Sequence, residues 1–349
     1  MGPSRRFDAL QTYRNRSAAD FAVTTAITGA SGHVGAALSR ALLAAGVRVR
    51  LLVHEDTRAL EGLAVHRVRA DLTNPNSLRR AFQDVEVVYH LAASISLDGR
   101  HIDTLRRVNI EGTRNVIQAC RSCKVRRVIH FSSIEALSDL NPQKVTDENN
   151  PLAGLEDTTL YGWTKAESER LLLEAVAEGL DAVIICPTAI LGPFDYKPSH
   201  LGKSLLDLYH NRLPALIRGG FNWVDVRDVV AASLTAQQRA GRGERYILSG
   251  TWRSLPEMAA LVQKITGRKT PPIALPVWLA RGVSRIAGKL PGLSSKYPAF
   301  TPDALLAISK HRCVSCEKAR QELDYNPRPL EVTLQDTFQW FREQGFLED

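Results

Sequence analysis

The sequence lacks any run of about 18 or more apolar residues, which is the length that a membrane-spanning helix requires. A spanning helix is therefore excluded, and we expect a soluble, cytoplasmic protein. Residues 1–20 carry four arginines but no apolar core, so they indicate neither a secretory signal nor a convincing transit peptide. We interpret residues 1–20 as a flexible N-terminal arm.

Cysteine is also scarce. Five cysteines in 349 residues are few, and their odd number does not suit a scaffold of paired disulfides. Two pairs have the Cys-x-x-Cys spacing of zinc sites, Cys120/Cys123 and Cys313/Cys316. They lie about 190 residues apart and lack the glycine knuckles of a zinc ribbon. We therefore expect reduced thiols and no metal, with a shared zinc site as the alternative.

No basic stripe interleaved with aromatic residues is present, so nucleic acid is not an expected partner. The formal net charge is +8, from 45 basic and 37 acidic residues, and the basic residues are spread along the chain. With 44% hydrophobic and 23% charged residues, the composition is that of a globular protein. An anionic small molecule is a partner that this charge permits.

The first half of the chain alternates short β-branched runs with helical patterns. Such alternation produces a parallel sheet with helices on both faces, so we predict a doubly wound α/β fold. The predicted strands are 23–28, 47–53, 65–69, 85–91, 125–131 and 181–186, and the predicted helices are 35–45, 77–82, 104–120 and 160–178.

From Pro187 onward, glycine, proline and aromatic residues interrupt shorter elements. We predict that 21–190 and 223–250 form the main domain, with 223–249 returning to its sheet. Residues 191–222 and 251–349 then form a smaller, mainly helical substrate-binding region. Its segment 273–290 is amphipathic; we favour a helix over the pocket, with membrane-surface attachment as the alternative. The side chains expected to build the pocket are Phe194, Tyr196, Leu205, Tyr209 and Phe221.

Three glycines follow the first predicted strand and open the first helix, where this spacing has a physical purpose. Gly29 permits a tight turn, Gly32 lets the backbone approach a pyrophosphate, and Gly35 lets the helix pack on the strand. Unpaired N–H groups at the helix N-terminus attract the same anion. The loop predicts a Rossmann-type dinucleotide site that includes Gly29, Ser31, Gly32, His33, Val34 and Gly35; a turn without ligand is the alternative.

The Gly-x-x-Gly-x-x-Gly spacing, in the wording Thr-Gly-Ala-Ser-Gly-His-Val-Gly, resembles the short-chain dehydrogenase/reductases. The resemblance is to their extended branch, and within it to dihydroflavonol-4-reductase-like and 3β-hydroxysteroid-dehydrogenase-like enzymes. It covers about residues 21–347. It implies an NAD(P)H-dependent oxidoreductase that acts on CH–OH or C=O groups, and a homodimer built on the helices around Asn109 and Tyr161.

The choice of cofactor depends on the end of the second strand. NAD-dependent relatives place a carboxylate there to accept from the ribose 2′-hydroxyl, but Val53 occupies that position. His54 stands where NADP-dependent relatives often have arginine, and Arg58 is close behind it. Glu55 and Asp56 argue the other way. We expect NADP(H) to be preferred over NAD(H), with contacts from His54 and Arg58.

The resemblance implies further cofactor contacts. Asp71 and Leu72 correspond to the pair that contacts adenine, although an N-cap role for Asp71 is equally compatible with the spacing. At Cys186 the chain departs from the family, which usually has arginine there. The remaining expected contacts follow the fourth and sixth predicted strands: Leu91, Ala92, Ala93, Pro187, Thr188, Ala189 and Ile190.

Tyr161 and Lys165 are spaced one helical turn apart and resemble the Tyr-Lys pair of the family. A phenol has a pKa of about 10, and a neighbouring ammonium favours its phenolate. We expect Tyr161 to transfer the proton, and Lys165 to tune Tyr161 and hold the nicotinamide ribose. Ser133 is the predicted hydroxyl that polarises the carbonyl, with Ser132 as a structural residue and an exchange of these two roles as the alternative.

Asn109 resembles a helix residue that supports the active site, and a surface asparagine is an equally weighted alternative. Dehydratases require a carboxylic acid directly after the active hydroxyl, where Ile134 stands, although Glu135 follows. Neutral residues 219–222 offer no second diphosphate site, although Arg218 is nearby. We therefore expect reduction of a ketone, or oxidation of a secondary alcohol, on an apolar substrate. The alternatives are a nucleotide-sugar epimerase or dehydratase and a catalytically silent NADP-binding sensor or scaffold.

Overall fold

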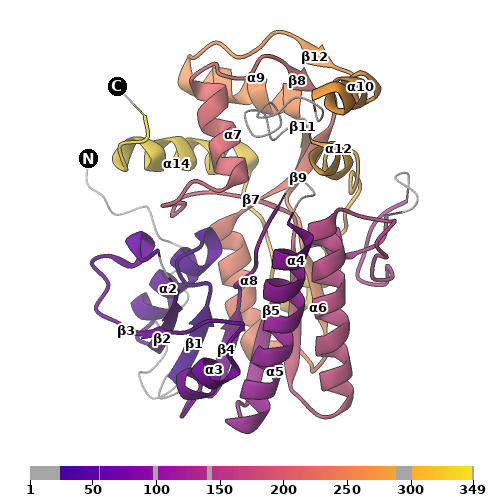
Figure 1. The fold of residues 1–349 in the computed structure, drawn as a ribbon. Helices are drawn as coiled ribbons and strands as arrows, with labels where there is room; N and C mark the ends of the chain where they lie inside the picture. Colours follow the sequence, from indigo (N-terminus) through magenta and orange to yellow (C-terminus); the bar gives the residue numbers. More distant parts are fainter. Residues whose placement is uncertain (1–23, 55, 97–100, 140–143, 288–300, 348–349) are drawn as a thin grey trace.

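The computed structural model describes residues 24–54, 56–96, 101–139, 144–287 and 301–347 (Figure 1). The predicted arm, 1–20, lies outside the described residues. At the centre is a seven-stranded sheet in which every neighbouring pair is parallel. In spatial order its strands are β10 (Arg245–Leu248), β6 (Ala182–Pro187), β5 (Arg127–Phe131), β4 (Val87–His90), β1 (Thr24–Thr28), β2 (Arg48–Val53) and β3 (His66–Arg69).

Helices cover both faces of this sheet, which confirms the predicted doubly wound α/β fold. Alternate residues of each strand supply two hydrophobic cores: Ile129 and Phe131 face one, and Val128 faces the other. On the first face lie α2 (His33–Ala44), α8 (Val226–Arg239) and α13 (Glu317–Leu323); on the second lie α3 (Pro75–Ala81), α5 (Gly112–Ser122) and α6 (Leu160–Ala177).

The sheet changes its winding direction between β1 and β4. From β1 the chain adds β2 and β3 on one side, and then crosses to add β4, β5, β6 and β10 on the other. At such a point the loops after the two adjacent strands diverge and leave a crevice at the carboxyl edge. The glycine loop follows β1, so the fold places it at this crevice.

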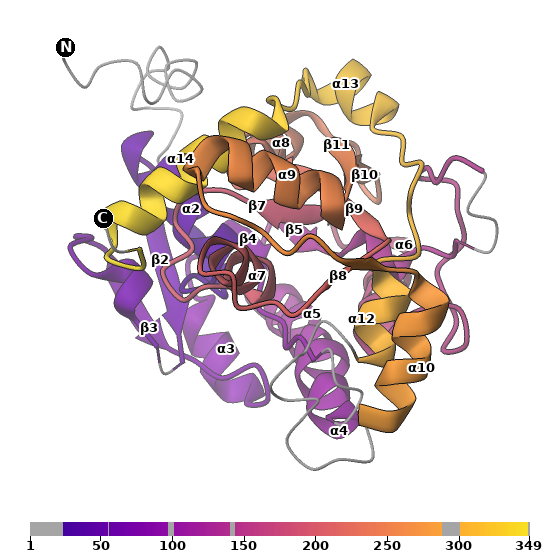
Figure 2. The same ribbon diagram turned by 90° about the horizontal axis from the view of Figure 1, so that it is seen from above.

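The substrate-binding region stands above the carboxyl edge of the main sheet (Figures 1 and 2). It contains a three-stranded sheet, β11 (Thr251–Ser254), β9 (Gly220–Asp225) and β7 (Ala189–Leu191), and the short pair β8 (Leu216–Ile217) and β12 (Ala274–Leu275). Its helices are α7 (His200–Tyr209), α9 (Leu255–Thr266), α10 (Val277–Ala287), α12 (Pro302–Ala307) and α14 (Leu330–Glu343).

Two segments lie elsewhere than the sequence predicts. Residues 223–225 belong to β9 of the three-stranded sheet, and the chain rejoins the main sheet only through α8 and β10. Helix α13, expected in the substrate-binding region, packs instead into the core beneath α8. The sequence around α13 does not show to which domain the helix belongs, because α13 is short and its packing partners precede it by about 80 residues.

Four of the five expected pocket residues make packing contacts within the protein, and Phe221 is only partly buried. Leu205 and Tyr209 of α7 are buried in a core that also contains Phe338 and Phe341 of α14. Phe194 and Tyr196 stack on Trp340 and lie under the Arg40 guanidinium. These four side chains therefore hold the substrate-binding region together, while Phe221 is only partly buried and packs on Trp223.

The two cysteine pairs lie on opposite faces of the main sheet. Cys120 belongs to the core under α5 and α6, and Cys316 belongs to the core under α8 and α13. A single metal ion therefore cannot bridge the pairs. Segment 273–290 is described as far as residue 287 and forms β12 and α10, with Trp278 exposed; membrane-surface attachment stays a prediction. Within the described residues, no helix has the length and apolarity to cross a membrane.

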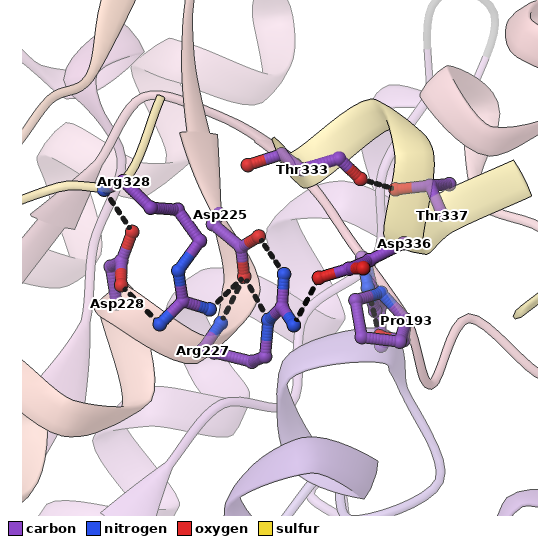
Figure 3. Close-up of polar contacts among 9 residues, drawn as sticks. Pro193, Asp225, Arg227, Asp228, Arg328, Thr333, Asp336 and Thr337 are labelled. Carbon is purple, nitrogen blue, oxygen red and sulfur yellow. Dashed lines mark hydrogen bonds and ion pairs between the residues drawn. The ribbon is translucent and has the colours of Figure 1, made fainter. Parts of the chain in front are cut away.

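A buried charge cluster joins α8 to the C-terminal segment (Figure 3). Asp225, whose side chain is fully buried, caps α8 by accepting from the Arg227 amide at 2.8 Å. It also accepts from both guanidinium groups, with Arg227 Nη2 at 2.7 Å and Arg328 Nη1 at 3.3 Å. Arg227 reaches on to Asp336 of α14 at 2.6 Å, and Arg328 to Asp228 at 2.9 Å. The cluster fixes α14 over the edge of the main domain.

We predict that Asp225→Asn lowers the free energy of unfolding by about 3 kcal/mol, because it removes a fully buried carboxylate charge that two partly buried guanidinium groups share. Chemical denaturation measures the change. Asp324→Asn is the matched control, since its pair with Arg239 is largely exposed and contributes less than about 0.5 kcal/mol. Equal losses in the two variants would contradict a structural role for the cluster.

Candidate active site

The glycine loop has the shape that a dinucleotide cradle requires. Gly29 has a φ of +70°, and a Cβ there would lie 2.6 Å from the Ala92 nitrogen. A Cβ on Gly35 would lie 2.1 Å from the Gly29 oxygen, so α2 starts in direct contact with the turn. Side chains at these two positions would fill the space between β1, α2 and the loop after β4. The predicted reasons for Gly29 and Gly35 hold.

The N-terminus of α2 is available to an anion. Gly32 is its N-cap and is exposed, no side chain caps the helix, and its first turn has no acidic residue. The partial positive charge of the helix end is therefore not neutralised locally. His33 directs its ring away, with Nε2 3.0 Å from the Pro193 oxygen. The residues fit a pyrophosphate bound at the backbone from Ser31 to Gly35.

Charged side chains gather beyond the end of β2. His54 is well exposed, and its Nε2 lies 4.0 Å from Asp71 Oδ2. Arg58 is held by Asp56, with Nη2 2.6 Å from the carboxylate, and Lys197 approaches the same carboxylate at 3.7 Å. The hydrogen bond and charge of Arg58 hold the pKa of Asp56 at about 2. Sequence reasoning missed Lys197, which comes from the distant loop after β7.

Asp71 begins a turn and does not cap α3. Its Oδ1 accepts from the backbone and hydroxyl of Thr73, at 2.8 and 2.9 Å. The N-cap of α3 is Asn74, whose side chain accepts hydrogen bonds from the backbone amides of Asn76 and Ser77. The N-cap alternative for Asp71 is therefore wrong, while the adenine contact stays a prediction.

The strand ends beside the loop are fixed by buried hydroxyls. Thr28 Oγ1 accepts from the amides of Leu91 and Ala92, both at 3.2 Å, and lies 2.8 Å from Nδ1 of His90. Thr188, in the segment after β6, donates its amide to the Leu248 oxygen at 3.1 Å. Leu91 to Ala93 and Pro187 to Ile190 therefore lie at the carboxyl edge beyond β4 and β6, the two strands that flank β5.

Ser133, Tyr161 and Lys165 converge at the end of β5. Ser133 is in the residues just beyond the strand, and its hydroxyl is hydrogen-bonded to Tyr161, which partly offsets the effect of burial on the pKa of Tyr161. Lys165, almost fully buried, donates from Nζ to the Phe131 oxygen at 2.5 Å. The hydroxyl of Ser132 points elsewhere and donates to Glu169 at 2.6 Å. The geometry thus pairs Ser133, and not Ser132, with Tyr161.

The start of α6 sets the position of Tyr161. Thr159 caps the helix by accepting from the Gly162 amide at 3.0 Å. Gly162 packs so closely that a Cβ there would lie 2.3 Å from Thr158 Oγ1 and 2.5 Å from the Glu135 oxygen. The first turn of α6 is therefore held against the Ser133–Ala136 turn on which the Ser133 hydroxyl lies.

Burial shifts the pKa values of Lys165, Tyr161 and Glu135 towards the neutral form of each side chain. It lowers the pKa of Lys165 to about 8, although Glu169 and then Cys186 oppose the change. It raises the pKa of Tyr161, and nearby Glu135 adds to that effect. The pKa of Glu135 is itself raised by burial. With no ligand bound, Tyr161 is a neutral phenol that can donate a proton.

A buried carboxylate lies directly below the pair. Glu169 accepts from Ser132 and from Arg245 Nε, the latter at 2.5 Å, and Cys186 Sγ lies 3.9 Å from it. Cys186 lies on β6, and Arg245 lies on the neighbouring strand β10. Sequence reasoning missed Glu169, although its spacing of four from Lys165 gave a signal. Arg245 gave none.

Asn109 is buried, so the surface alternative is wrong. It lies in a wide helical turn, Arg106–Glu111, between α4 (Ile102–Leu105) and α5. Its amide accepts from the Ser94 amide at 2.7 Å, and donates to the Ser94 oxygen and to Thr164 Oγ1, both at 2.9 Å. Asn109 thereby ties the loop after β4 to the helix that carries Tyr161.

Known proteins resemble both the sequence and this arrangement. Residues 25–249 match the family described as "NAD dependent epimerase/dehydratase family". Sterol demethylase protein B of Methylococcus capsulatus is 38% identical, over 93% of this chain and all of the relative. A putative dihydroflavonol 4-reductase of Synechocystis is 31% identical, over 92% and 95%. The crystal structure of gox2253 has a TM-score of 0.82 at 32% identity, over 93% and 99%.

The chain belongs to the NAD dependent epimerase/dehydratase family. This confirms the resemblance to the extended short-chain dehydrogenase/reductases and the Rossmann-type fold. It also confirms, at the level of the family, an NAD(P)-dependent oxidoreductase. A homodimer, a cytoplasmic location and the individual roles of the site residues stay predictions.

We predict that Gly162→Ala lowers kcat by at least about tenfold, since a displacement of roughly 1 Å between reacting groups costs up to about a hundredfold. The added methyl group would force α6 away from Glu135 and move Tyr161 relative to Ser133. Steady-state kinetics with a substrate of the enzyme measures the loss. Gly282→Ala is the control, because nothing lies within 4 Å of a Cβ at that helical glycine. Unchanged turnover in Gly162→Ala would refute the packing argument.

Proposed function

We propose that this member of the family is an NADPH-dependent reductase of a ketone on an apolar, ring-containing small molecule, which also catalyses the reverse oxidation of the secondary alcohol. The observation that carries the proposal is the convergence of Ser133, Tyr161 and Lys165 beside the carboxyl edge that holds the glycine loop. A hydroxyl, a phenol and an ammonium in this order are suited to proton transfer at an oxygen atom.

The bound dinucleotide would supply a hydride to the carbonyl carbon. The protein would supply the proton and polarise the bond. Ser133 donates a hydrogen bond to the substrate oxygen, and Tyr161 donates the proton that turns the developing alkoxide into an alcohol. Lys165 stabilises the phenolate that Tyr161 becomes, because a buried positive charge lowers the free energy of a neighbouring anion. In the oxidation direction the phenolate accepts the same proton.

The substrate class rests on what surrounds the three residues. Buried Ile134, not an acid, follows Ser133, so no carboxylic acid stands directly after the hydroxyl to protonate a leaving group. Residues 219–222 are neutral, and Arg218 is exposed at the end of β8. The names of the two relatives, a sterol demethylase protein and a putative dihydroflavonol 4-reductase, each refer to a compound that contains rings. These features together support an apolar ring ketone over a nucleotide sugar.

The preference for NADPH rests on the side chains beyond β2. Val53 supplies no carboxylate to repel a 2′-phosphate. His54 is exposed beside this strand end, and Arg58 and Lys197 bring two cations to the same loop. Asp56 is the group that pairs with both cations in the structure, so a 2′-phosphate would compete with it. Contacts from Arg58 to a phosphate would be charge-assisted and therefore strong.

We predict that Tyr161→Phe lowers kcat for ketone reduction by at least about a hundredfold, since general acid catalysis contributes roughly 10²–10⁴. The Kd for NADPH, measured by fluorescence titration, should stay within about threefold. Tyr325→Phe is the matched control, because it removes a buried hydroxyl that donates to Ser249 far from Ser133. Residual turnover above a hundredth of the wild-type value would contradict the role of Tyr161.

We predict that the Michaelis constant is lower for NADPH than for NADH. Arg58→Ala should raise the constant for NADPH about tenfold, which corresponds to one lost charge-assisted hydrogen bond, and leave that for NADH unchanged. Arg114→Ala is the control, because it removes an arginine that is similarly exposed and ion-paired but lies on α5. Equal or better use of NADH by the wild type would overturn the preference.

A further inference from the structure

Glu169 is a charged group that the proposed reaction does not use. It lies on α6 four residues after Lys165, which itself lies four residues after Tyr161, so the three side chains follow one face of the helix. The carboxylate of Glu169 has no exposed surface. A buried carboxylate is costly unless charges and hydrogen bonds compensate it. The structure provides both.

Two elements of the main sheet supply this compensation. Ser132, next to the proposed catalytic Ser133, donates to one carboxylate oxygen at 2.6 Å. Arg245 of β10 donates from Nε to the other at 2.5 Å. Arg245 is itself held in place, since its Nη1 donates to the Glu148 oxygen at 2.8 Å. The Glu148 side chain in turn accepts from the Ile247 amide at 2.9 Å.

Lys165 and Glu169 thus place an ammonium and a carboxylate one turn apart on a buried part of α6. Lys165 needs its proton to support Tyr161, yet burial favours the neutral amine. The hydrogen bond from Lys165 to the Phe131 oxygen does not add a negative charge. Glu169 does. We propose that Glu169, fixed by Arg245 and Ser132, is a positioning residue that keeps Lys165 protonated and so keeps the acid of the reaction in its working state.

This inference rests on the proposed function for its catalytic meaning, but the charge of Lys165 can be measured without any reaction. The groups that act on Lys165 or lie beside it come from every element packed around it. Burial lowers the pKa values of the two neighbouring histidines, so they are neutral. Burial raises the pKa of the Cys186 thiol, so it is neutral too. The groups are Tyr161 and Glu169 of α6, His90 of β4, His130 of β5, Cys186 of β6, Arg245 of β10 and Glu135.

Removing the charge of Glu169 therefore has a definite sign. Glu169→Gln keeps an oxygen that can accept from Ser132 and Arg245, but it removes the negative charge one helical turn from Lys165 while the Arg245 cation stays. The pKa of Lys165, already lowered to about 8, must fall further. Reduction requires protonated Lys165, so the rate should be lost at a lower pH than in the wild type.

The first test is the kcat of ketone reduction across the pH range. In Glu169→Gln the basic limb should move down by about one pH unit, which is a tenfold change in proton affinity. Glu169→Asp keeps the charge and should restore the limb. Asp181→Asn is the matched control, since Asp181 also pairs with an arginine of the sheet, Arg127, but at the opposite end. A purely structural role would lower kcat equally at every pH.

The second test needs neither cofactor nor substrate. In protein with ¹³C-labelled lysine, the Cε shift of Lys165, assigned with Lys165→Met, reports its titration directly. Glu169→Gln should lower the midpoint by about one unit. Arg245→Gln leaves the carboxylate uncompensated and should raise it. The opposite signs keep the test valid if one variant does not fold. An unmoved midpoint, or a shift of the reverse sign, overturns the inference.

The two tests also separate this inference from the proposed function. If the wild type reduces no ketone in a broad panel, the proposed function fails, and the titration of Lys165 still decides the role of Glu169. If the wild type reduces ketones but neither the rate profile nor the titration responds to Glu169→Gln, only the inference fails.

Discussion

Parallel pairing of β1 with β4 is the constraint on which the rest of the structure depends. In this pairing Thr28 lies opposite His90, so the glycine loop and the loop after β4 leave the sheet side by side. Gly29 then contacts the Ala92 backbone, and Gly35 contacts the Gly29 oxygen. A shift in the register of β1 and β4 would separate Gly29 from Ala92, and a Cβ at either glycine would collide with backbone atoms. The cofactor cradle is therefore a consequence of strand order and register as much as of the glycines.

The electrostatic environment of the proposed catalytic residues follows from the same packing. The helix that carries Tyr161 and Lys165 lies on the sheet closely enough that Gly162 contacts the Glu135 backbone. Such contact removes water, and burial then pushes lysine and tyrosine towards their neutral forms. The carboxylate of Glu169, one helical turn from Lys165, opposes this effect on the lysine, and Arg245 compensates the buried carboxylate. The negative charge of Glu169 thus compensates part of the desolvation of Lys165 that close packing causes.

The substrate-binding region is attached to the main domain by interactions of two kinds. The Phe194 and Tyr196 rings, in the loop after β7, pack against Trp340 of α14 and lie under the Arg40 guanidinium of α2 in the main domain. The Asp225 cluster links α8 to α14 and to the segment before it (Figure 3). Both attachments end on α14, so the last helix of the chain sets the position of the region above the active site. The site geometry therefore depends on residues that are distant in sequence from every residue of the reaction.

The sequence by itself determined the doubly wound fold, the family and the identity of the glycine loop. Those features are local: strand and helix periodicity, and a spacing of glycines whose purpose is steric. It also singled out Ser133, Tyr161 and Lys165, whose roles stay proposals. Only the tertiary structure showed that Ser132 faces Glu169, that Asn109 is buried, that Asn74 caps α3, and that α13 returns to the main core. It alone brought Arg245 to Glu169 and Lys197 to Asp56. These contacts join residues about 76 and 140 positions apart. No periodicity records such pairs, because they form only when strand order and helix packing are already set.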